Sequence, residues 1–85
     1  MANQQIGKIT HYFSNIGVGV IGLTDGSLGV GDMIKIEGHG VDFEQIVTSM
    51  QIDHQPVANA QAGQSVGLKT DQAVKEGDVV YKVED

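Results

Sequence analysis

Glycine is the residue that most constrains this chain, because twelve glycines divide its 85 residues into short segments. The segments between them, interrupted once by a proline, are too short for stable amphipathic helices. Many are rich in β-branched or aromatic residues, which favours strands. Residues 6–13 and 16–23 are two such runs, separated by Ser14 and Asn15, and we expect them to form consecutive antiparallel strands. The spacing therefore predicts an all-β protein.

The second of these runs alternates glycine with apolar residues. Ile16, Val18 and Val20 share one face, and Gly17 and Gly19 lie on the other. A glycine within a strand indicates a bend or a close approach by neighbouring backbone. We interpret these glycines as part of the curvature of a barrel.

A glycine followed by a polar residue precedes a short apolar run three times, at positions 31–32, 63–64 and 77–78. Glycine tolerates positive φ, and a polar side chain can form a hydrogen bond with the backbone of a turn. We expect each pair to form a turn from which a strand begins. In the strand after the first turn, alternation places Ile34 and Ile36 on one face.

Residues 41–54 form a long run in which the phase of the apolar positions changes. Phe43 and Val47 fit one alternation, whereas Met50 and Ile52 fit the other. Such a change within one strand predicts a β-bulge, which we place near residues 48–49.

Pro56 is expected to end this strand, and residues 57–61 to form a short helical turn before the sheet resumes. The count is then six or seven antiparallel strands. A chain of this size buries only about 60 to 65% of its unfolded surface, so its strand edges need protection, and closing the sheet provides it. We expect residues 1–85 to form a single domain, a small closed antiparallel β-barrel with a core over about residues 6–83.

The net charge of −6 limits the kinds of partner this chain can bind. The chain has eleven acidic residues, five lysines and no arginine. Arginine grips phosphate with two hydrogen bonds, and nucleic-acid affinity depends largely on cations. We therefore expect no DNA binding. The chain also lacks cysteine, a signal-like N-terminus and any apolar run of about 20 residues, so we expect a cytoplasmic protein with no membrane association.

Four blocks of turn and strand residues follow one another over nearly all of residues 6–83. They are Gly26-x-Leu28-x-Val30-Gly31-Asp32-x-Ile34-x-Ile36, Val47-x-Ser49-Met50, Ala62-Gly63-x-x-Val66-Gly67-Leu68 and Gly77-Asp78-Val79-Val80. Their order resembles the second domain of elongation factor Tu and related translational GTPases. The resemblance implies a barrel of the reductase, isomerase and elongation factor type that docks on RNA, on the ribosome or on a translation protein. A similar barrel is attached to certain peptidases, so the fold implies no single activity.

The GTPase machinery of that family is missing. No Gly-x4-Gly-Lys-Ser/Thr segment is present to bind phosphates, and the chain is too short to hold a nucleotide domain. The glutamate and arginine with which the family contacts tRNA would fall on Gln51 and His54. Gln51 can still form hydrogen bonds with a nucleotide, but His54 cannot replace the fixed charge of a guanidinium. We therefore expect a binding module that is not an enzyme.

The candidate binding residues are Gln51, His54, Lys69 and Tyr12. The first three mark the barrel surface that we expect to dock on RNA, on the ribosome or on a translation protein. Tyr12 and Phe13 are neighbours on a strand, so one should enter the core while the other faces outward and could stack on a base. Ordinary packing explains either side chain as well.

A metal site could use the histidines at positions 11, 39 and 54, with Asp53 beside the last. Their spacing matches no recognised ligand motif, and adjacent strand residues point to opposite faces. We expect no metal, no cofactor and no catalytic residues. The alternative to RNA docking is a protein-interaction or accessory barrel for an enzyme such as a peptidase, which the acidic composition favours. The partner and the oligomeric state stay open.

Overall fold

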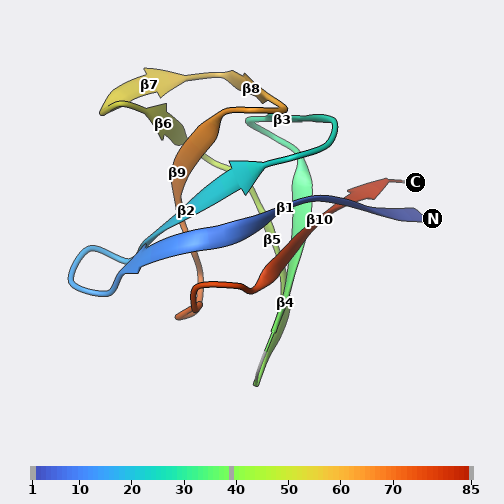
Figure 1. Cartoon of the computed structure of the whole chain (residues 1–85), viewed down its shortest axis with the longest axis vertical. Coiled ribbons are helices and arrows are strands. Elements are labelled where there is room, and N and C mark those ends of the chain that lie inside the picture. Colours follow the sequence, from blue (N-terminus) through green and yellow to red (C-terminus); the bar gives the residue numbers. More distant parts are fainter. Residues whose placement is uncertain (1, 39, 85) are drawn as a thin grey trace.

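The computed structural model describes residues 2–38 and 40–84, and in this part of the chain every regular element is a β-strand (Figure 1). Eight strands form one antiparallel sheet in the order β5-β4-β10-β1-β2-β9-β6-β7, and β3 pairs separately with β8. The bounds are β1 Ala2–Phe13, β2 Val18–Leu23, β3 Ser27–Gly29, β4 Met33–Gly38, β5 Val41–Ile46, β6 Met50–Ile52, β7 Gln55–Val57, β8 Asn59–Gln61, β9 Ser65–Lys69 and β10 Val79–Glu84. The all-β antiparallel prediction is confirmed, with ten strands among these residues instead of six or seven.

The large sheet is not closed by strand pairing, so the closed barrel is not confirmed. Within residues 2–38 and 40–84, its end strands β5 and β7 are not paired with each other. A buried side chain instead links β5 to the end of β9 and the loop that follows it. The Nε2 atom of Gln45, on β5, donates a hydrogen bond to the carbonyl oxygen of Lys69 at 2.8 Å, and its Oε1 accepts one from the backbone N–H of Asp71 at 2.7 Å. Alternation in the sequence predicts strands, but it does not determine how the two outer strands meet.

The hydrophobic core draws side chains from both sheets. Its buried members are Ile6, Ile9, Ile21, Leu23, Leu28, Ile34, Ile36, Phe43, Val47, Met50, Ala60, Val66, Leu68, Val74 and Val80. The alternation predicted for β4 is confirmed, because Ile34 and Ile36 are both buried. Side chains alternate along a strand, so β2 turns Ile21 and Leu23 inward and leaves Val18 and Val20 partly exposed on its other face.

The three predicted turns are present and share one hydrogen-bonding pattern. In each, the glycine has φ between +95° and +100°, a region that other residues rarely adopt. The polar side chain after the glycine accepts a hydrogen bond of 2.8 Å from the backbone N–H three residues earlier. The pairs are Gly29 with Asp32, Gln61 with Gln64 and Lys75 with Asp78.

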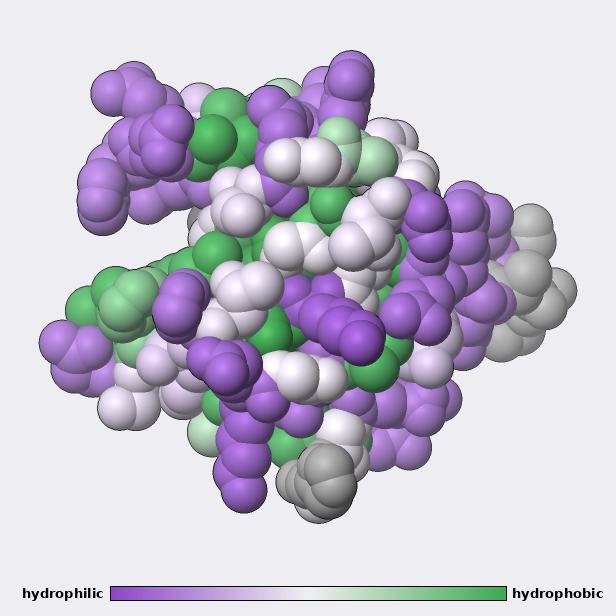
Figure 2. All heavy atoms as spheres, viewed as in Figure 1, coloured by the Kyte–Doolittle hydropathy of each residue, from purple (hydrophilic) through white to green (hydrophobic). Residues whose placement is uncertain are grey.

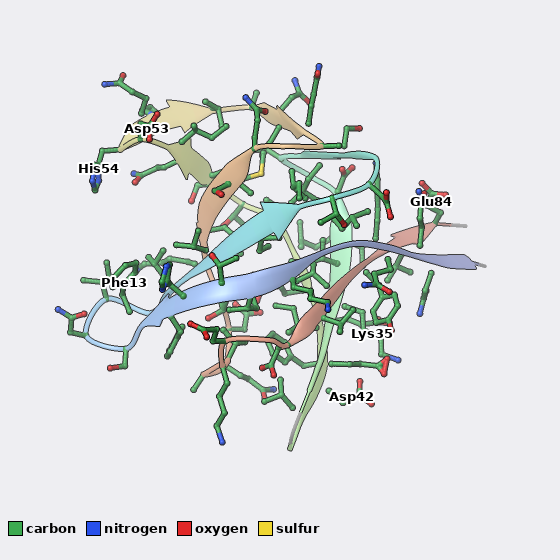
Figure 3. The ribbon with its side chains drawn as sticks, in the orientation of Figure 1. Phe13, Lys35, Asp42, Asp53, His54 and Glu84 are labelled. Carbon is green, nitrogen blue, oxygen red and sulfur yellow. The ribbon has the colours of Figure 1, made fainter. Side chains whose placement is uncertain are left out.

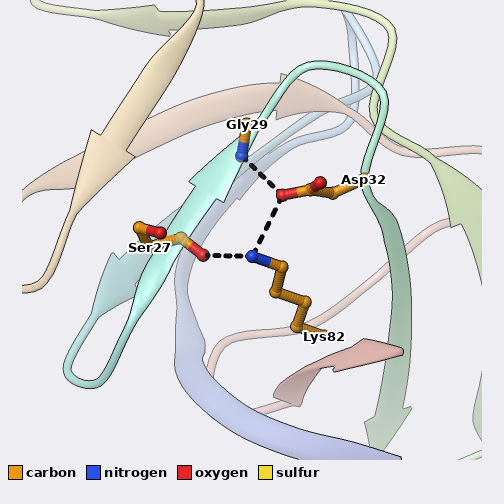
Figure 4. Close-up of polar contacts among 4 residues, drawn as sticks. All are labelled: Ser27, Gly29, Asp32 and Lys82. Atoms are coloured by element: carbon orange, nitrogen blue, oxygen red, sulfur yellow. Dashed lines mark hydrogen bonds and ion pairs between the residues drawn. The ribbon is translucent and has the colours of Figure 1, made fainter. Parts of the chain in front are cut away.

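Asp32 also links its turn to the C-terminal strand. The Nζ atom of Lys82, on β10, lies 3.4 Å from Oδ2 of Asp32 and donates a hydrogen bond of 3.3 Å to the carbonyl oxygen of Ser27 (Figure 4). The same Oδ2 accepts the hydrogen bond from Gly29 within the turn. These contacts connect the start of β4 and the small sheet with β10.

The β-bulge predicted near residues 48–49 is wrong, because the strand is interrupted there. Strand β5 ends before Val47, whose N–H donates to the carbonyl of Asp32 while its own carbonyl accepts from Gly31, each at 2.8 Å. Val47 thus bonds to the turn before β4, and β6 begins afresh at Met50. The interruption explains the change of phase.

Two further local predictions are wrong. Pro56 does not end a strand; it lies inside β7, opposite Gln51 of β6. Residues 59–61 are not helical; they form β8 and pair with β3. β7 is the second strand of a hairpin that begins with its neighbour β6, whereas β8 pairs with β3, which lies much earlier in the chain. Short-range pattern does not show the pairing of β8 with β3. Among the residues described, no helix is long and apolar enough to cross a membrane.

Candidate functional site

A hollow of about 320 Å³ lies between the loop that joins β1 to β2 and the hairpin of β6 and β7. We call it the groove. Figure 2 shows it as a notch between the lobe that carries β6 and β7 and a projection with hydrophobic side chains below it. The groove is lined by Phe13, Ile16, Val18, Val20, Gln51, Asp53, His54, Ser65 and Gly67.

The groove opens because the sheet splits at this point. In the described chain, β6 pairs with β9 at a single position, Gln51 opposite Gly67. Beyond that pair β6 is paired, among the described residues, with β7 alone, while β9 stays paired with β2. Gly67 has no side chain to fill the space between the diverging strands. Strand pairing that ends early, together with a glycine at the end point, therefore produces the hollow.

One wall and the floor of the groove are apolar. Val18 and Val20 come from the partly exposed face of β2, and Ile16 continues that face into the loop. Phe13, at the end of β1, is 47% exposed, and Ile16 is 57% exposed. The ring of His11 lies 6.4 Å from that of Phe13, between ring centroids. The face that the sequence groups as Ile16, Val18 and Val20 thus lines the groove.

The opposite rim is the turn of the β6–β7 hairpin, where Asp53 and His54 lie across the groove from Phe13 (Figure 3). The pair Ile52 with Gln55 closes this two-residue turn. Both turn residues have positive φ, 51° for Asp53 and 64° for His54. Turns of this kind favour Asn-Gly, because the left-handed conformation costs most residues roughly 1 to 2 kcal/mol each, and less for Asn and Asp. The rim is therefore held in a strained conformation.

The structure brings three of the four predicted site residues together. Gln51 and His54 both line the groove. Lys69 lines a smaller adjoining hollow of about 170 Å³, which shares Gln51 and Gly67 with the groove. Tyr12 is separate from them, because it is partly buried against the core.

Phe13, rather than Tyr12, is the outward aromatic side chain. The pairing of β1 with β2 shifts register between Ile9 and His11, so the alternation that starts at Ile9 does not extend to Tyr12. A register shift of this kind leaves no mark in the apolar pattern of residues 6–13. The choice between the two rings therefore requires the structure.

Two of the three histidines, His11 and His54, lie within the described residues. His39 lies outside the described residues. Among the others, no group of three or more histidine, cysteine, aspartate or glutamate side chains is arranged to hold a metal ion. The expectation of no metal site stays a prediction, because His39 is not included.

An antiparallel sheet around one core, with an apolar groove where the sheet splits, defines a small all-β domain with a candidate binding surface. No family model matches the chain. It is 38% identical over 78 residues to an uncharacterized protease of Methanocaldococcus jannaschii. The match covers 91% of this chain and 19% of the protease, so the chain spans about a fifth of the length of that relative.

Two solved structures have the same fold. Both are crystal structures of the C-terminal domain of a Geobacillus thermoleovorans protein assigned as a U32 peptidase. The TM-scores are 0.85 and 0.87, and the matches cover 91% and 95% of this chain and 96% and 93% of those chains. Sequence identity is 15% in both, so the likeness establishes the fold alone.

These comparisons overturn the resemblance to elongation factor Tu. The relative is a protease, and the similar structures belong to a U32 peptidase. The four sequence blocks consist of turns and strand starts, such as Gly31-Asp32 and Gly77-Asp78, whose hydrogen bonds the fold itself requires. Residues that are needed for a fold do not identify the function built on it. The assignment to translation was therefore wrong.

Proposed function

We propose that this chain is a non-catalytic accessory module of a peptidase and that it binds polypeptide. The observation that carries the proposal is the 38% identity over 78 residues with a segment that makes up 19% of a protease. A separate C-terminal domain with the same fold, from a protein assigned as a U32 peptidase, supports it. A module of this size would assist the peptidase, while another part of the protein cleaves the substrate.

The groove supports a binding role. Binding sites are commonly concave and mainly apolar, with a few polar groups that orient the ligand. Here Val18 and Val20 provide the apolar floor, and Gln51, Ser65 and Asp53 provide polar groups around it. We further propose that the curved sheet acts as a closed barrel, because Gln45 links β5 to the end of β9 and the loop after it across part of the open side.

A chimera tests the proposal. In the Methanocaldococcus jannaschii protease, the matching segment is replaced by this chain or by a flexible linker of equal length, and hydrolysis of denatured casein is measured. We expect the chimera to recover most of the wild-type activity and the linker variant to lose it. A folded chimera that is as inactive as the linker variant contradicts the proposal.

A second measurement separates this role from RNA binding. The tagged chain is used to capture partners from native lysate, with and without ribonuclease treatment. An accessory module of a peptidase should retain its protein partner after RNA is digested. Loss of every partner on digestion contradicts the proposal.

A further inference from the structure

We infer that the groove holds an extended peptide segment in which an apolar side chain lies next to a lysine or arginine. This inference rests on the proposed function, because it names the polypeptide that the module would take. The apolar side chain would pack between Phe13 and Val18, and the basic side chain would lie beside Asp53 at the hairpin turn.

The apolar part of the inference comes from the exposed side chains. Phe13 and Ile16 are among the large hydrophobic residues most exposed in the described chain, and both line the groove. Val18 and Val20 extend the same surface inward. Single exposed apolar residues are common, but their grouping around a hollow marks a binding site. An apolar side chain placed there would be removed from water by all four.

The charge of the partner follows from the rim. Asp53 is the carboxylate among the described residues that line the groove, and no lysine is among them. Lys69 lies in the adjoining smaller hollow, so the Asp53 end of the groove is the more negative one. The chain as a whole carries a net charge of −6. Complementary charge therefore favours a basic residue in the partner at that end.

The backbone of the rim is a second, independent observation. Asp53 and His54 hold positive φ where Asn-Gly would be relaxed. Residues with such φ angles cluster at functional sites, and here they place a carboxylate and an imidazole at the mouth of the groove. The turn thus retains polar side chains at a cost in stability.

The size of the groove favours an extended segment over a folded domain. Nine described residues line it, whereas a stable interface between folded proteins uses about 20 to 30 residues on each side. A volume of about 320 Å³ suits one or two side chains of an extended peptide. With so few contacts, we expect a dissociation constant on the order of 0.1 to 1 mM.

The test is an NMR titration of the 85-residue chain with capped heptapeptides. The first probe has one leucine flanked by lysines, the second has serine in place of the leucine, and the third has glutamates in place of the lysines. We expect saturable shifts of the amide signals of Ile16, Gln51 and His54 with the first probe. Binding of the second and third probes should be at least about threefold weaker.

Variants of the chain test whether the peptide binds in the groove. Phe13→Ser should weaken binding of the first probe about tenfold, Asp53→Asn about threefold, and Gly67→Val more than tenfold by filling the floor. The matched control is Val30→Ser, because Val30 and Phe13 are both 47% exposed but Val30 lies outside the groove. Val30→Ser should bind as wild type. If Gly67→Val does not fold, Phe13→Ser and Asp53→Asn still show whether the peptide binds in the groove.

Several outcomes overturn the inference. They are the absence of saturable shifts at millimolar peptide, equal binding of all three probes, and shifts centred outside the groove. Concentration-dependent dimerisation through Phe13 without peptide binding would make a second copy the occupant, which also overturns it. The protease chimera distinguishes this inference from the proposed function. If a chimera that carries Phe13→Ser is as active as the unmutated chimera, the module still assists the peptidase, but the groove does not take part.

Discussion

Gln45 on β5 forms hydrogen bonds with the end of β9 and the loop after it, at the carbonyl of Lys69 and the N–H of Asp71. Its side chain is 6% exposed, which is rare for glutamine because burying an amide costs free energy unless it is hydrogen bonded. Here both ends of the amide are satisfied. Among the described residues β5 and β9 are not paired as strands, and this one side chain links them instead.

Substitution Gln45→Leu should therefore destabilise the chain although leucine is similar in size and more hydrophobic. It leaves the Lys69 carbonyl and the Asp71 N–H without their partner, which costs about 1 to 2 kcal/mol. In urea denaturation, the midpoint should fall by roughly 1 M with little change in the slope.

Gln72→Leu is the matched control for this substitution, because Gln72 is exposed and lies in the loop that follows β9. It should leave the free energy of unfolding within about 0.5 kcal/mol of the wild-type value. Equal effects of the two substitutions would show that the Gln45 bridge adds nothing to stability.

Asp78→Ala should destabilise the chain through the turn before β10. The Asp78 side chain accepts a hydrogen bond from the N–H of Lys75 at 2.8 Å, and the residue is 3% exposed. The same turn docks on β1, because the Asp78 carbonyl accepts from the N–H of Ile9 at 2.8 Å. We expect a loss of about 1 to 3 kcal/mol. Thermal unfolding measures it, with Asp25→Ala as the exposed control and Asp78→Asn as a variant that keeps an acceptor and should lose less.

The three glycine turns could be predicted from sequence because all their requirements are local. A residue that accepts positive φ and a polar side chain after it, as in Gly31-Asp32, suffice to form the turn and its hydrogen bond. The inward face of β4 could be predicted for the same reason, since alternation of Ile34 and Ile36 is a property of one strand.

The groove could be predicted only in part. Gln51 and His54 were identified through a family resemblance that proved wrong, although both line the groove. The groove itself depends on the single pairing of Gln51 with Gly67 in the described chain, which joins residues far apart in sequence. Its aromatic wall depends on a register shift in β1 that exposes Phe13. Such long-range pairing has no signature within a short apolar run.

Gly7→Ala should disrupt the central strand of the sheet. Gly7 lies at a register shift in β1, where it pairs with Leu23 of β2 and Val80 of β10. A Cβ atom on Gly7 would clash with the backbone carbonyl oxygen of Gly22, which a side-chain rotation cannot relieve. We expect a loss of about 1 to 3 kcal/mol in the free energy of unfolding, measured by urea denaturation.

Gly67→Ala is the control for this substitution. The nearest atom to a Cβ at Gly67 is Cγ1 of Val18 at 3.5 Å, an ordinary contact, and alanine restricts the unfolded chain more than glycine. Its stability should equal or slightly exceed that of wild type. If both alanine variants unfold at the same urea concentration, backbone proximity at Gly7 is not what requires glycine there.

Replacing the strained turn by its relaxed equivalent should stabilise the protein and weaken its binding. In the double variant Asp53→Asn, His54→Gly, the positive φ angles of 51° and 64° would be occupied by the residues that favour them. We expect the free energy of unfolding to rise by about 1 kcal/mol, because relief of strain is partly offset by the greater freedom of glycine in the unfolded chain.

The same double variant loses the Asp53 carboxylate and should bind the lysine-flanked peptide about threefold more weakly. Asp53→Asn alone separates the two effects, since it removes the charge and leaves His54 strained. A double variant that is less stable than wild type would show that the hairpin turn is not strained, and the φ angles of Asp53 and His54 would then give no support to a binding role for this rim.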